Sequence, residues 1–275
     1  MGVVRAVRQC VPRPVKVFIN RLFGTEFRPY IKDKDVEGVR FKFWIGDEQG
    51  RDWYDLRCTD PTWPEMGFIK QHMISRGDVV LECGAHHGCT TILLSRWVGS
   101  EGHVVAFEPS ESNCRIMKKN LRLNRIRNVT VERKAVGASR GTVSINEASN
   151  SRVLTSRKGA SVSLARLDDY AHLRPTFLKI DVEGFEIEVL KGAQSILLSK
   201  PKLAIEIHPD RLAEYGGSPE DIFRLIETES YKFWLHDDPK QERSTSAALA
   251  VTTEYQPQTA ITKRVQLFCM PLPCV

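Results

Sequence analysis

The amino-acid sequence predicts an α/β fold in which strands and helices alternate around an open sheet. A short apolar run at residues 79–83 passes through a glycine-rich turn into a helical pattern at 89–98. A second apolar strand at 104–108 follows at the interval expected of a βαβ unit. Strand and helix patterns then alternate as far as residue 269. At 275 residues, the chain is long enough for one large α/β domain with a small extension.

The glycine-rich turn after the first strand is a candidate ligand-binding loop. Gly84 lets the backbone turn sharply, and Gly88 lets a ligand or the next helix come close. The helix that follows offers unpaired N–H groups to a polar ligand. The first two strands end in Glu82 and Glu108, and this interval suits a unit whose second acid binds the ribose hydroxyls of a nucleoside.

The spacing of this loop differs from the Gly-x-Gly-x-x-Gly pattern of dinucleotide sites. A short loop behind an acid suits a cofactor without a pyrophosphate, and S-adenosylmethionine, whose amino and sulfonium groups are cationic, meets that description. Glycine-rich turns also occur in α/β proteins that bind no nucleotide, so the loop by itself leaves the cofactor open.

The remaining elements are expected in the following order. Alternating aromatic and polar residues at 39–60, with Gly46 and Gly50 as turn markers, predict a hairpin ahead of the main domain. The later elements are a helix at 65–75, a helix from Ser110 to Leu123, a strand at 129–136, short strands or a mobile loop at 141–167, a strand ending at Asp181, a helix with Phe185, Val189 and Ile196 on one face, a strand at 203–208, a helix opened by Ser218-Pro219, and strands at 231–235 and 264–269.

Composition and cysteine usage narrow the class of protein. Hydrophobic residues make up 41% and charged residues 27%, which predicts a packed core rather than disorder. No apolar run reaches the roughly 18 residues that span a bilayer, and the N-terminus lacks the pattern of a signal peptide. The seven cysteines are an odd number with no Cys-x-x-Cys pair, which favours a reducing compartment. We therefore expect a cytoplasmic protein.

The positive charge of the protein is concentrated in an N-terminal arm, residues 1–34. The arm has eight basic and two acidic residues and so carries the whole formal net charge of +6. Its apolar side chains recur at helical spacing, at Val11, Val15, Phe18, Ile19, Leu22 and Phe23. A short helix packed on the domain is the favoured interpretation, and a basic amphipathic helix on an anionic membrane or partner is the alternative. In the second case the protein is cytoplasmic but peripheral to a membrane.

Four motifs resemble the FkbM family of S-adenosylmethionine-dependent methyltransferases. They are Val80-Leu-Glu-Cys-Gly-Ala-His-His-Gly88, Ala106-Phe-Glu-Pro109, Leu167-Asp-Asp169, and Leu178-Lys-Ile-Asp-Val-Glu-Gly-Phe-Glu186 with Leu190-Lys-Gly-Ala193. The run Lys-Ile-Asp-Val-Glu-Gly is the most specific of these. The resemblance extends from about residue 65 to 269 and leaves the basic arm outside.

This resemblance implies a class I methyltransferase fold: a Rossmann-like three-layer α/β sandwich with a seven-stranded mixed sheet and helices on both faces. The implied organisation is a basic N-terminal extension at 1–64, with a short helix and a hairpin, and a methyltransferase domain at 65–275. Family members of known activity mostly methylate oxygen, often on sugars or natural products. The implied reaction is therefore methyl transfer to a hydroxyl of a small molecule or glycan.

The resemblance also implies a set of residues that hold S-adenosylmethionine. These are Glu82, Gly84, Ala85, His86, Gly88, Glu108, Pro109, Asn113, Ala135, Val136 and Asp181. Glu82 and His86 stand where the family usually has Asp and Asn. Glutamate keeps the charge and histidine can still hydrogen-bond a carboxylate, so we expect binding to be retained. No acid after the third strand is placed to pair with the adenine amino group, and backbone groups near Ala135 and Val136 are expected to serve instead.

Asp181, Glu183 and His208 are the predicted catalytic residues, because they should meet at the carboxyl ends of neighbouring strands, where open sheets place ligands. We assign His208 as the base that takes the acceptor proton, since an unperturbed pKa of about 6.5 would leave it largely neutral. Each residue also has a structural alternative: Asp181 bonded to the loop or cofactor, Glu183 in the first turn of a helix, and His208 at a strand end.

The sequence is also compatible with two other functions. A catalytically silent adapter on the same fold is the first alternative, because function resides in sites rather than folds. Methylation of nucleic acid is the second; the arm favours it, but the balanced charge of the other 241 residues makes nucleic acid an unexpected partner. No metal is expected, because the adjacent His86 and His87 have no Cys/His ligand set around them.

Overall fold

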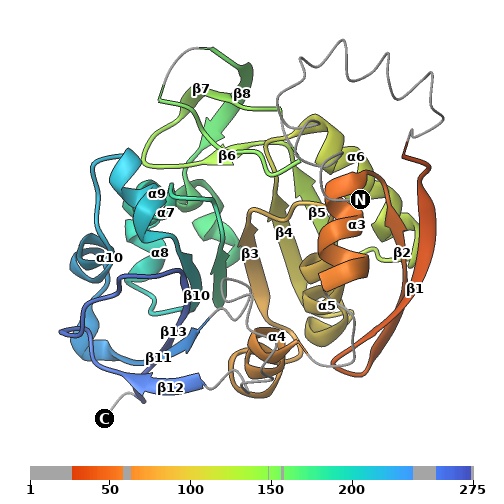
Figure 1. Ribbon diagram of the computed structural model, residues 1–275. Helices are drawn as coiled ribbons and strands as arrows, with labels where there is room; N and C mark the ends of the chain where they lie inside the picture. The colour runs from red at the N-terminus through yellow and green to blue at the C-terminus, as the bar shows by residue number, and fades with distance from the viewer. Residues whose placement is uncertain (1–26, 58–62, 148, 156–157, 238–251, 274–275) are drawn as a thin grey trace, which may run out of the picture.

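The computed structural model describes residues 27–57, 63–147, 149–155, 158–237 and 252–273, and its centre is an eight-stranded mixed sheet (Figure 1). In spatial order the strands are β12 (Thr252–Tyr255), β11 (Tyr231–Asp237), β13 (Val265–Pro271), β10 (Lys202–Ile207), β9 (Phe177–Ile180), β3 (Val79–Cys83), β4 (His103–Phe107) and β5 (Val129–Glu132). The run from β10 to β5 is parallel, and β13, β11 and β12 join antiparallel.

The strand order creates a switch point between β3 and β9. From β3 the chain moves outward through β4 to β5, and it then returns to form β9 and β10 on the other side of β3. The loops after β3 and β9 therefore leave the sheet in opposite directions, which opens a crevice at their carboxyl ends. This arrangement confirms the predicted class I methyltransferase fold. The sheet has eight strands rather than seven because β12 pairs with β11 at the edge.

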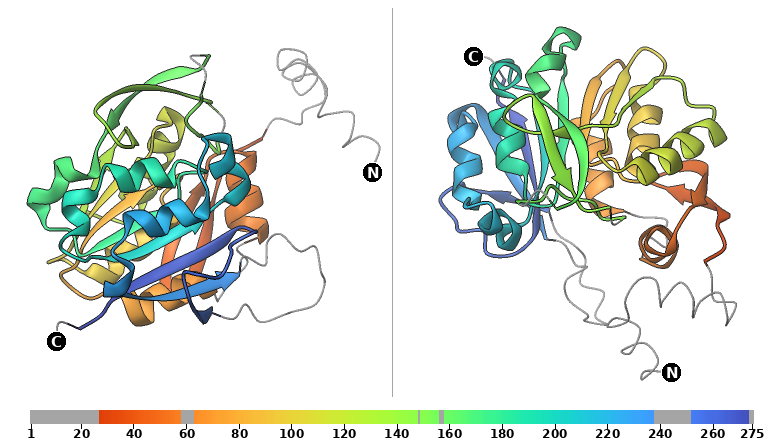
Figure 2. Two further views of the ribbon diagram at one scale, coloured as in Figure 1. Left: turned by 90° about the vertical axis from the view of Figure 1, so that its left-hand side faces the viewer. Right: turned by 90° about the horizontal axis from the view of Figure 1, so that it is seen from above.

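Helices cover both faces of the sheet (Figure 2). Successive strand residues point to opposite faces, so Val80 packs in the apolar cluster of one face and Leu81 in that of the other. One face carries α5 (Cys89–Val98) and α6 (Glu111–Leu123), and the other carries α7 (Glu186–Lys191), α8 (Gln194–Leu197), α9 (Pro209–Glu214) and α10 (Pro219–Leu225). Both faces of the central strands are buried, which explains why these strands are continuously apolar.

The N-terminal hairpin is present, but its position differs from the prediction. Its strands are β1 (Tyr30–Val36) and β2 (Val39–Ile45), joined at Glu37 and Gly38, which both have positive φ. Of the predicted turn markers, Gly46 precedes α3 (Glu48–Arg51) and Gly50 lies within this helix, which the π-helix η1 (Asp52–Arg57) follows. The first strand is largely polar and exposed, so it carries no apolar alternation from which it could be predicted.

Several elements predicted as continuous are divided in the structure. The helix expected at 65–75 is α4 (Pro64–Phe68) followed by the π-helix η2 (Ile69–Met73), and short 3-10 helices occur at η3 (Leu167–Leu173) and η4 (Thr228–Ser230). The third predicted strand is split into β5 and β6 (Ala135–Val136). β6 joins β8 (Ala160–Ala165) and β7 (Gly141–Ile145) in a separate three-stranded sheet, so the 141–167 segment contains short strands.

The predicted single helix after residue 185 is divided into α7 and α8 at Gly192 and Ala193. A Cβ on Gly192 would lie 2.1 Å from the carbonyl oxygen of Gly137, so this position brings two backbone segments together. Only glycine permits so close an approach without displacing the neighbouring chain.

The predicted arm helix at 11–23 lies outside the described residues, and so does most of the charge of the arm. Its contact with an anionic membrane or partner stays a prediction, as does the domain boundary at 64/65. No helix in the described ranges has the length and apolar content to cross a membrane. The hairpin at 30–45 packs on the domain, since Phe43 and Ile45 share an apolar cluster with Ile92 and Met117.

A buried asparagine attaches the hairpin to the main domain. The Oδ1 atom of Asn120 accepts a hydrogen bond from the Trp44 N–H at 2.6 Å, and its Nδ2 donates to the His87 carbonyl at 3.0 Å. Asn124, one turn later, forms the same kind of bridge to the N–H and carbonyl of Lys42, but these two hydrogen bonds are exposed to solvent.

Asn120→Ala should lower the free energy of unfolding by about 1–3 kcal/mol, because it leaves buried backbone groups without partners. Asn124→Ala is the matched control. It should lower the free energy of unfolding by less than about 1 kcal/mol, since water can replace hydrogen bonds that are exposed to solvent. Urea denaturation measures both values. If both variants lose the same free energy of unfolding, the burial of the Asn120 hydrogen bonds does not determine how much they stabilise the fold.

Candidate active site

A narrow pocket, open to solvent on one side, lies at the carboxyl ends of β3, β4 and β9; we call it the cavity. Six of the residues predicted to hold the cofactor line it: Gly84, Glu108, Pro109, Ala135, Val136 and Asp181. Phe107, Lys134, Val182, Phe185 and residues 151–153 complete the lining. None of these last residues was among the predicted site residues, although Phe107, Val182 and Phe185 lie within the motifs that resemble the family. Residues 151–153 lie between β7 and β8, and their position depends on tertiary packing.

Glu108 is buried at the wall of this cavity and is held by its own chain. Its Oε2 accepts a hydrogen bond from the N–H of His86 at 2.9 Å, and its Oε1 accepts one from the N–H of Ser110 at 2.8 Å. Asn113 Nδ2 and Ser151 Oγ also donate to Oε1, at 3.2 and 3.1 Å. Burial raises the pKa of Glu108, although these donors act in the opposite direction.

Gly84 brings the ends of β3 and β9 into contact. Its φ is +86°, and a Cβ at this position would lie 1.8 Å from the carbonyl oxygen of Asp181. No other residue can therefore occupy the position without moving the backbone of the neighbouring strand. Gly88 brings the loop close to α6, because a Cβ there would meet the side chain of Met117 at 2.7 Å.

The structure places the other five predicted cofactor residues, Glu82, Ala85, His86, Gly88 and Asn113, outside the cavity lining. Glu82 is fully buried and accepts hydrogen bonds from the hydroxyls of Thr90 and Thr91 at the start of α5. Burial raises the pKa of its carboxyl. Glu82 therefore joins the first strand to the helix that follows it.

His86 also uses its side chain within the protein. Its φ is +50°, a region in which Asn, Asp and His are more common than other non-glycine residues. Nδ1 is 2.7 Å from the Tyr54 hydroxyl and Nε2 is 2.9 Å from Ser149 Oγ, and the ring stacks on His87 with centroids 3.8 Å apart. Burial lowers its pKa well below the usual range, so the imidazole is neutral. A contact with a cofactor carboxylate stays a prediction.

The three predicted catalytic residues do come together. They belong to a set that we call the acidic cluster: Asp181, Glu183, Glu186, Glu206 and His208. His208 Nδ1 donates to Glu186 Oε1 at 3.0 Å, and its Nε2 faces Glu183 Oε2 at 3.6 Å and Glu206 Oε1 at 4.0 Å. Asp181 belongs to both the cluster and the cavity lining, so the two are continuous.

Basic side chains offset the charge of this cluster. Arg211 pairs with Glu183 at 2.8 Å, Arg264 pairs with Glu206, and the Nζ of Lys179 is 3.6 Å from Asp181. Without such partners, several carboxylates could not remain ionised in a site that excludes water.

The expectation of an unperturbed pKa for His208 is wrong. Burial lowers this pKa, but the hydrogen bond and charge of Glu186, with the charges of Asp181 and Glu183, outweigh burial and raise it. Glu186 was absent from the predicted site because it reads as part of the α7 helix. Glu206 could have been found, because residues two apart on a strand share a face and His208 follows Glu206 at that interval.

The fold and the site together define an α/β methyltransferase of class I. The family model for the methyltransferase FkbM domain matches residues 82–233, more than half of the 275-residue chain. The chain belongs to the FkbM methyltransferase family.

Individual relatives are more distant. The hexuronic acid methyltransferase AglP of Haloferax volcanii is 40% identical over 53 residues, which cover 19% of this chain and only 20% of that protein. A methyltransferase FkbM structure from Methylobacillus flagellatus is 21% identical with a TM-score of 0.46, over 70% of this chain and 43% of the other. An S-adenosylmethionine-dependent O-methyltransferase of Thermotoga maritima is 14% identical with a TM-score of 0.44, over 93% and 82% of the two chains.

The contact between Gly84 and Asp181 can be tested against a glycine of equal backbone conformation. Gly77 also has a φ of +86°, but a Cβ there would meet nothing within 4 Å. Alanine at either position should lower the free energy of unfolding by about 1–2 kcal/mol, because alanine disfavours the left-handed conformation. Gly84→Ala should lower it by about 1–3 kcal/mol more, because the added Cβ overpacks the contact with Asp181. Denaturant unfolding measures the difference, and equal losses would contradict the close contact.

Proposed function

We propose that this methyltransferase binds S-adenosylmethionine in the cavity beside Glu108 and methylates a hydroxyl of a small molecule or glycan. The observation that carries the proposal is the continuity of the cavity with the acidic cluster through Asp181. The cavity has the character of a nucleoside site, and the acidic cluster contains groups able to take a proton. Methyl transfer to oxygen needs both, side by side.

The residues of the cavity fit the cofactor. Glu108 ends the second strand and faces the cavity with a carboxylate that can accept from ribose hydroxyls. Ala135 and Val136 offer backbone groups, and the carboxylate of Asp181 suits a cationic amino group. Ser151 donates to Oε1 of Glu108, so residues 149–153 must shift for a ribose hydroxyl to use that oxygen. S-adenosylmethionine supplies a methyl group that its positive sulfur has already activated.

The acidic cluster supplies the group that acts on the acceptor hydroxyl. Nδ1 of His208 donates to the buried carboxylate of Glu186, so Nε2 is the nitrogen that can take a proton. Asp181 and Glu183 lie beside it and are proposed to position the acceptor and the cofactor. Their charges also stabilise the imidazolium that forms when Nε2 accepts the proton.

A sugar is the acceptor class that we favour. The match to a hexuronic acid methyltransferase, 40% identical over 53 residues, supports this choice.

Glu108→Ala should weaken the binding of S-adenosylmethionine by about 1–3 kcal/mol, the usual cost of losing hydrogen bonds to a charged group. Calorimetric titration measures the affinity, and thermal unfolding shows whether the variant is folded. Glu111→Ala, three residues later and exposed, is the control and should bind normally. Undiminished affinity in a folded Glu108→Ala variant would show that Glu108 does not hold the ribose. Failure of the unmodified chain to bind would favour the adapter alternative.

His208→Ala should lower turnover roughly 10²–10⁴-fold, the usual contribution of a general base, with little change in cofactor affinity. Transfer of labelled methyl groups to a panel of hexuronic acids and neutral sugars measures this. His172→Ala, an exposed histidine, is the control. If His208→Ala stays active while Asp181→Asn or Glu183→Gln loses activity, a carboxylate takes the proton instead.

A further inference from the structure

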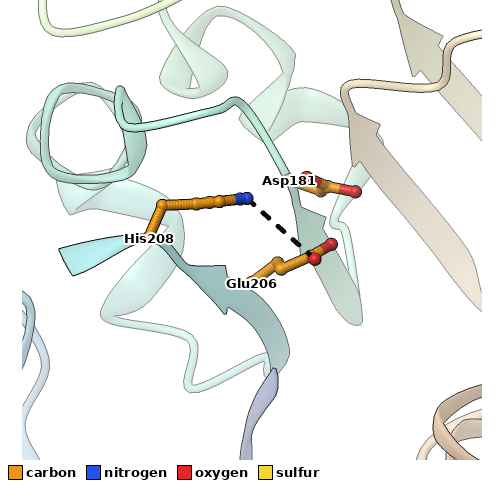
Figure 3. Close-up of side chains that lie close together, drawn as sticks. All are labelled: Asp181, Glu206 and His208. Carbon is orange, nitrogen blue, oxygen red and sulfur yellow. Dashed lines mark ion pairs between the residues drawn. The ribbon is translucent and has the colours of Figure 1, made fainter. Parts of the chain in front are cut away.

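Three side chains of the acidic cluster converge in the manner of metal ligands (Figure 3). They are the carboxylates of Asp181 and Glu206 and the imidazole of His208, and one oxygen or nitrogen atom from each lies within 4.8 Å of the other two. Asp181 follows β9, whereas Glu206 and His208 lie two residues apart at the end of the adjacent strand β10. The convergence is therefore set by the parallel pairing of two strands.

The imidazole nitrogen that faces this group is buried and unpartnered. His208 is 2% exposed, and its Nε2 has no hydrogen-bond partner among the described residues. Figure 3 shows the ring directed towards the carboxylates of Asp181 and Glu206. A buried polar atom without a partner is costly and uncommon, so its position indicates a ligand.

A carboxylate on the far side of the ring fixes its orientation. Nδ1 of His208 donates to Glu186 Oε1 at 3.0 Å, and the same oxygen accepts the Gly184 N–H at 2.9 Å. With one proton held at Nδ1 by Glu186, the ring directs Nε2 to the cluster, where it can bind a cation once it carries no proton. Metal-binding histidines typically have this arrangement, in which a carboxylate sets the tautomer and strengthens the ligand.

We propose that Asp181, Glu206 and His208 bind a divalent cation of the Mn²⁺ or Mg²⁺ class. Two carboxylate oxygens and one imidazole nitrogen suit Mn²⁺, and three protein ligands leave positions open for an acceptor oxygen. Octahedral ligands about 2.1 Å from an ion lie about 3.0 to 4.2 Å apart, so donors within 4.8 Å of one another enclose it after side-chain shifts of about 1 Å. The site was not predicted from the sequence because its ligands are neither adjacent nor a Cys/His set.

The inference rests on the proposed function and changes one role within it. Nε2 of His208 cannot be a ligand and a base at the same time, so with the cation bound it is a ligand. The cation then lowers the pKa of a hydroxyl coordinated to it and fixes the orientation of the acceptor. Arg264 and Lys179 compensate the carboxylates when the cation is absent, and Arg264 shares Glu206 with it when present.

The test uses the full chain, first dialysed against EDTA and then titrated with Mn²⁺ alone. Electron paramagnetic resonance of free Mn²⁺ and calorimetry measure binding. We expect one saturable site that Mg²⁺ displaces, and at least a tenfold loss of affinity in Asp181→Asn, Glu206→Gln and His208→Gln. Glu186→Gln should lower the affinity for Mn²⁺ by about 10–100-fold, because Glu186 orients His208 without touching the ion.

Asp210→Asn, an exposed acid at the same end of β10, and His172→Ala are the controls and should bind Mn²⁺ normally. Thermal unfolding identifies any variant that does not fold, and the four substitutions keep side-chain size close to the original or reduce it only slightly. Absence of saturable binding by the unmodified chain overturns the proposal. Unchanged affinity in the three ligand variants, all folded, also overturns it.

The outcome can be separated from that of the proposed function. Methyl transfer that stops on chelation and returns with Mn²⁺ supports the cation site. Full methyl transfer in the chelated protein overturns the cation site, leaves the methyltransferase function intact and returns Nε2 to the role of base. If the unmodified chain binds Mn²⁺ but shows no S-adenosylmethionine binding in calorimetry, the proposed cofactor site alone is overturned.

Discussion

The contact between Gly84 and the carbonyl oxygen of Asp181 determines how the whole site is assembled. It joins the carboxyl ends of β3 and β9, the two strands between which the chain reverses direction. Any side chain at position 84 would force these ends apart. Asp181 belongs to both the cavity lining and the acidic cluster, so this backbone contact also sets where the two meet.

Buried charge is the main energetic cost of this arrangement. Glu82, Glu108 and Glu186 are each at most 3% exposed, and each carboxylate accepts hydrogen bonds from the protein itself. The more exposed edge of the cluster is compensated by Arg211 and Arg264. Removal of one partner would leave an uncompensated charge, so these residues act as a group rather than as separate ion pairs.

Two segments from outside the central sheet pack beside Glu108 at the wall of the cavity. The hairpin region contributes Tyr54, which contacts His86, and the segment between β7 and β8 contributes Ser149 and Ser151. His86 connects them, since its side chain bonds to both segments and its N–H bonds to Glu108. A histidine in place of the usual asparagine is therefore accommodated by neighbours particular to this chain.

The sequence by itself determined the parts that depend on local chemistry. Apolar periodicity and glycine position were enough to define β3, α5 and the Ser110 cap of α6, and the motif of residues 178–186 was enough to indicate the family. Glycine at 84 and acids at 82, 108 and 181 could be identified because strand ends in an α/β unit have a regular spacing.

Tertiary structure decided which of those residues face the cavity. Glu82 and Glu108 both end apolar strands, yet one is directed to the start of α5 and the other to the cavity. The role of Glu186 and the raised pKa of His208 depend on atoms 22 residues apart in the chain, brought to 3.0 Å by the pairing of β9 with β10. Local sequence patterns do not specify such distances. The pKa of a buried group depends on every charge and hydrogen bond around it, and these come from distant parts of the chain.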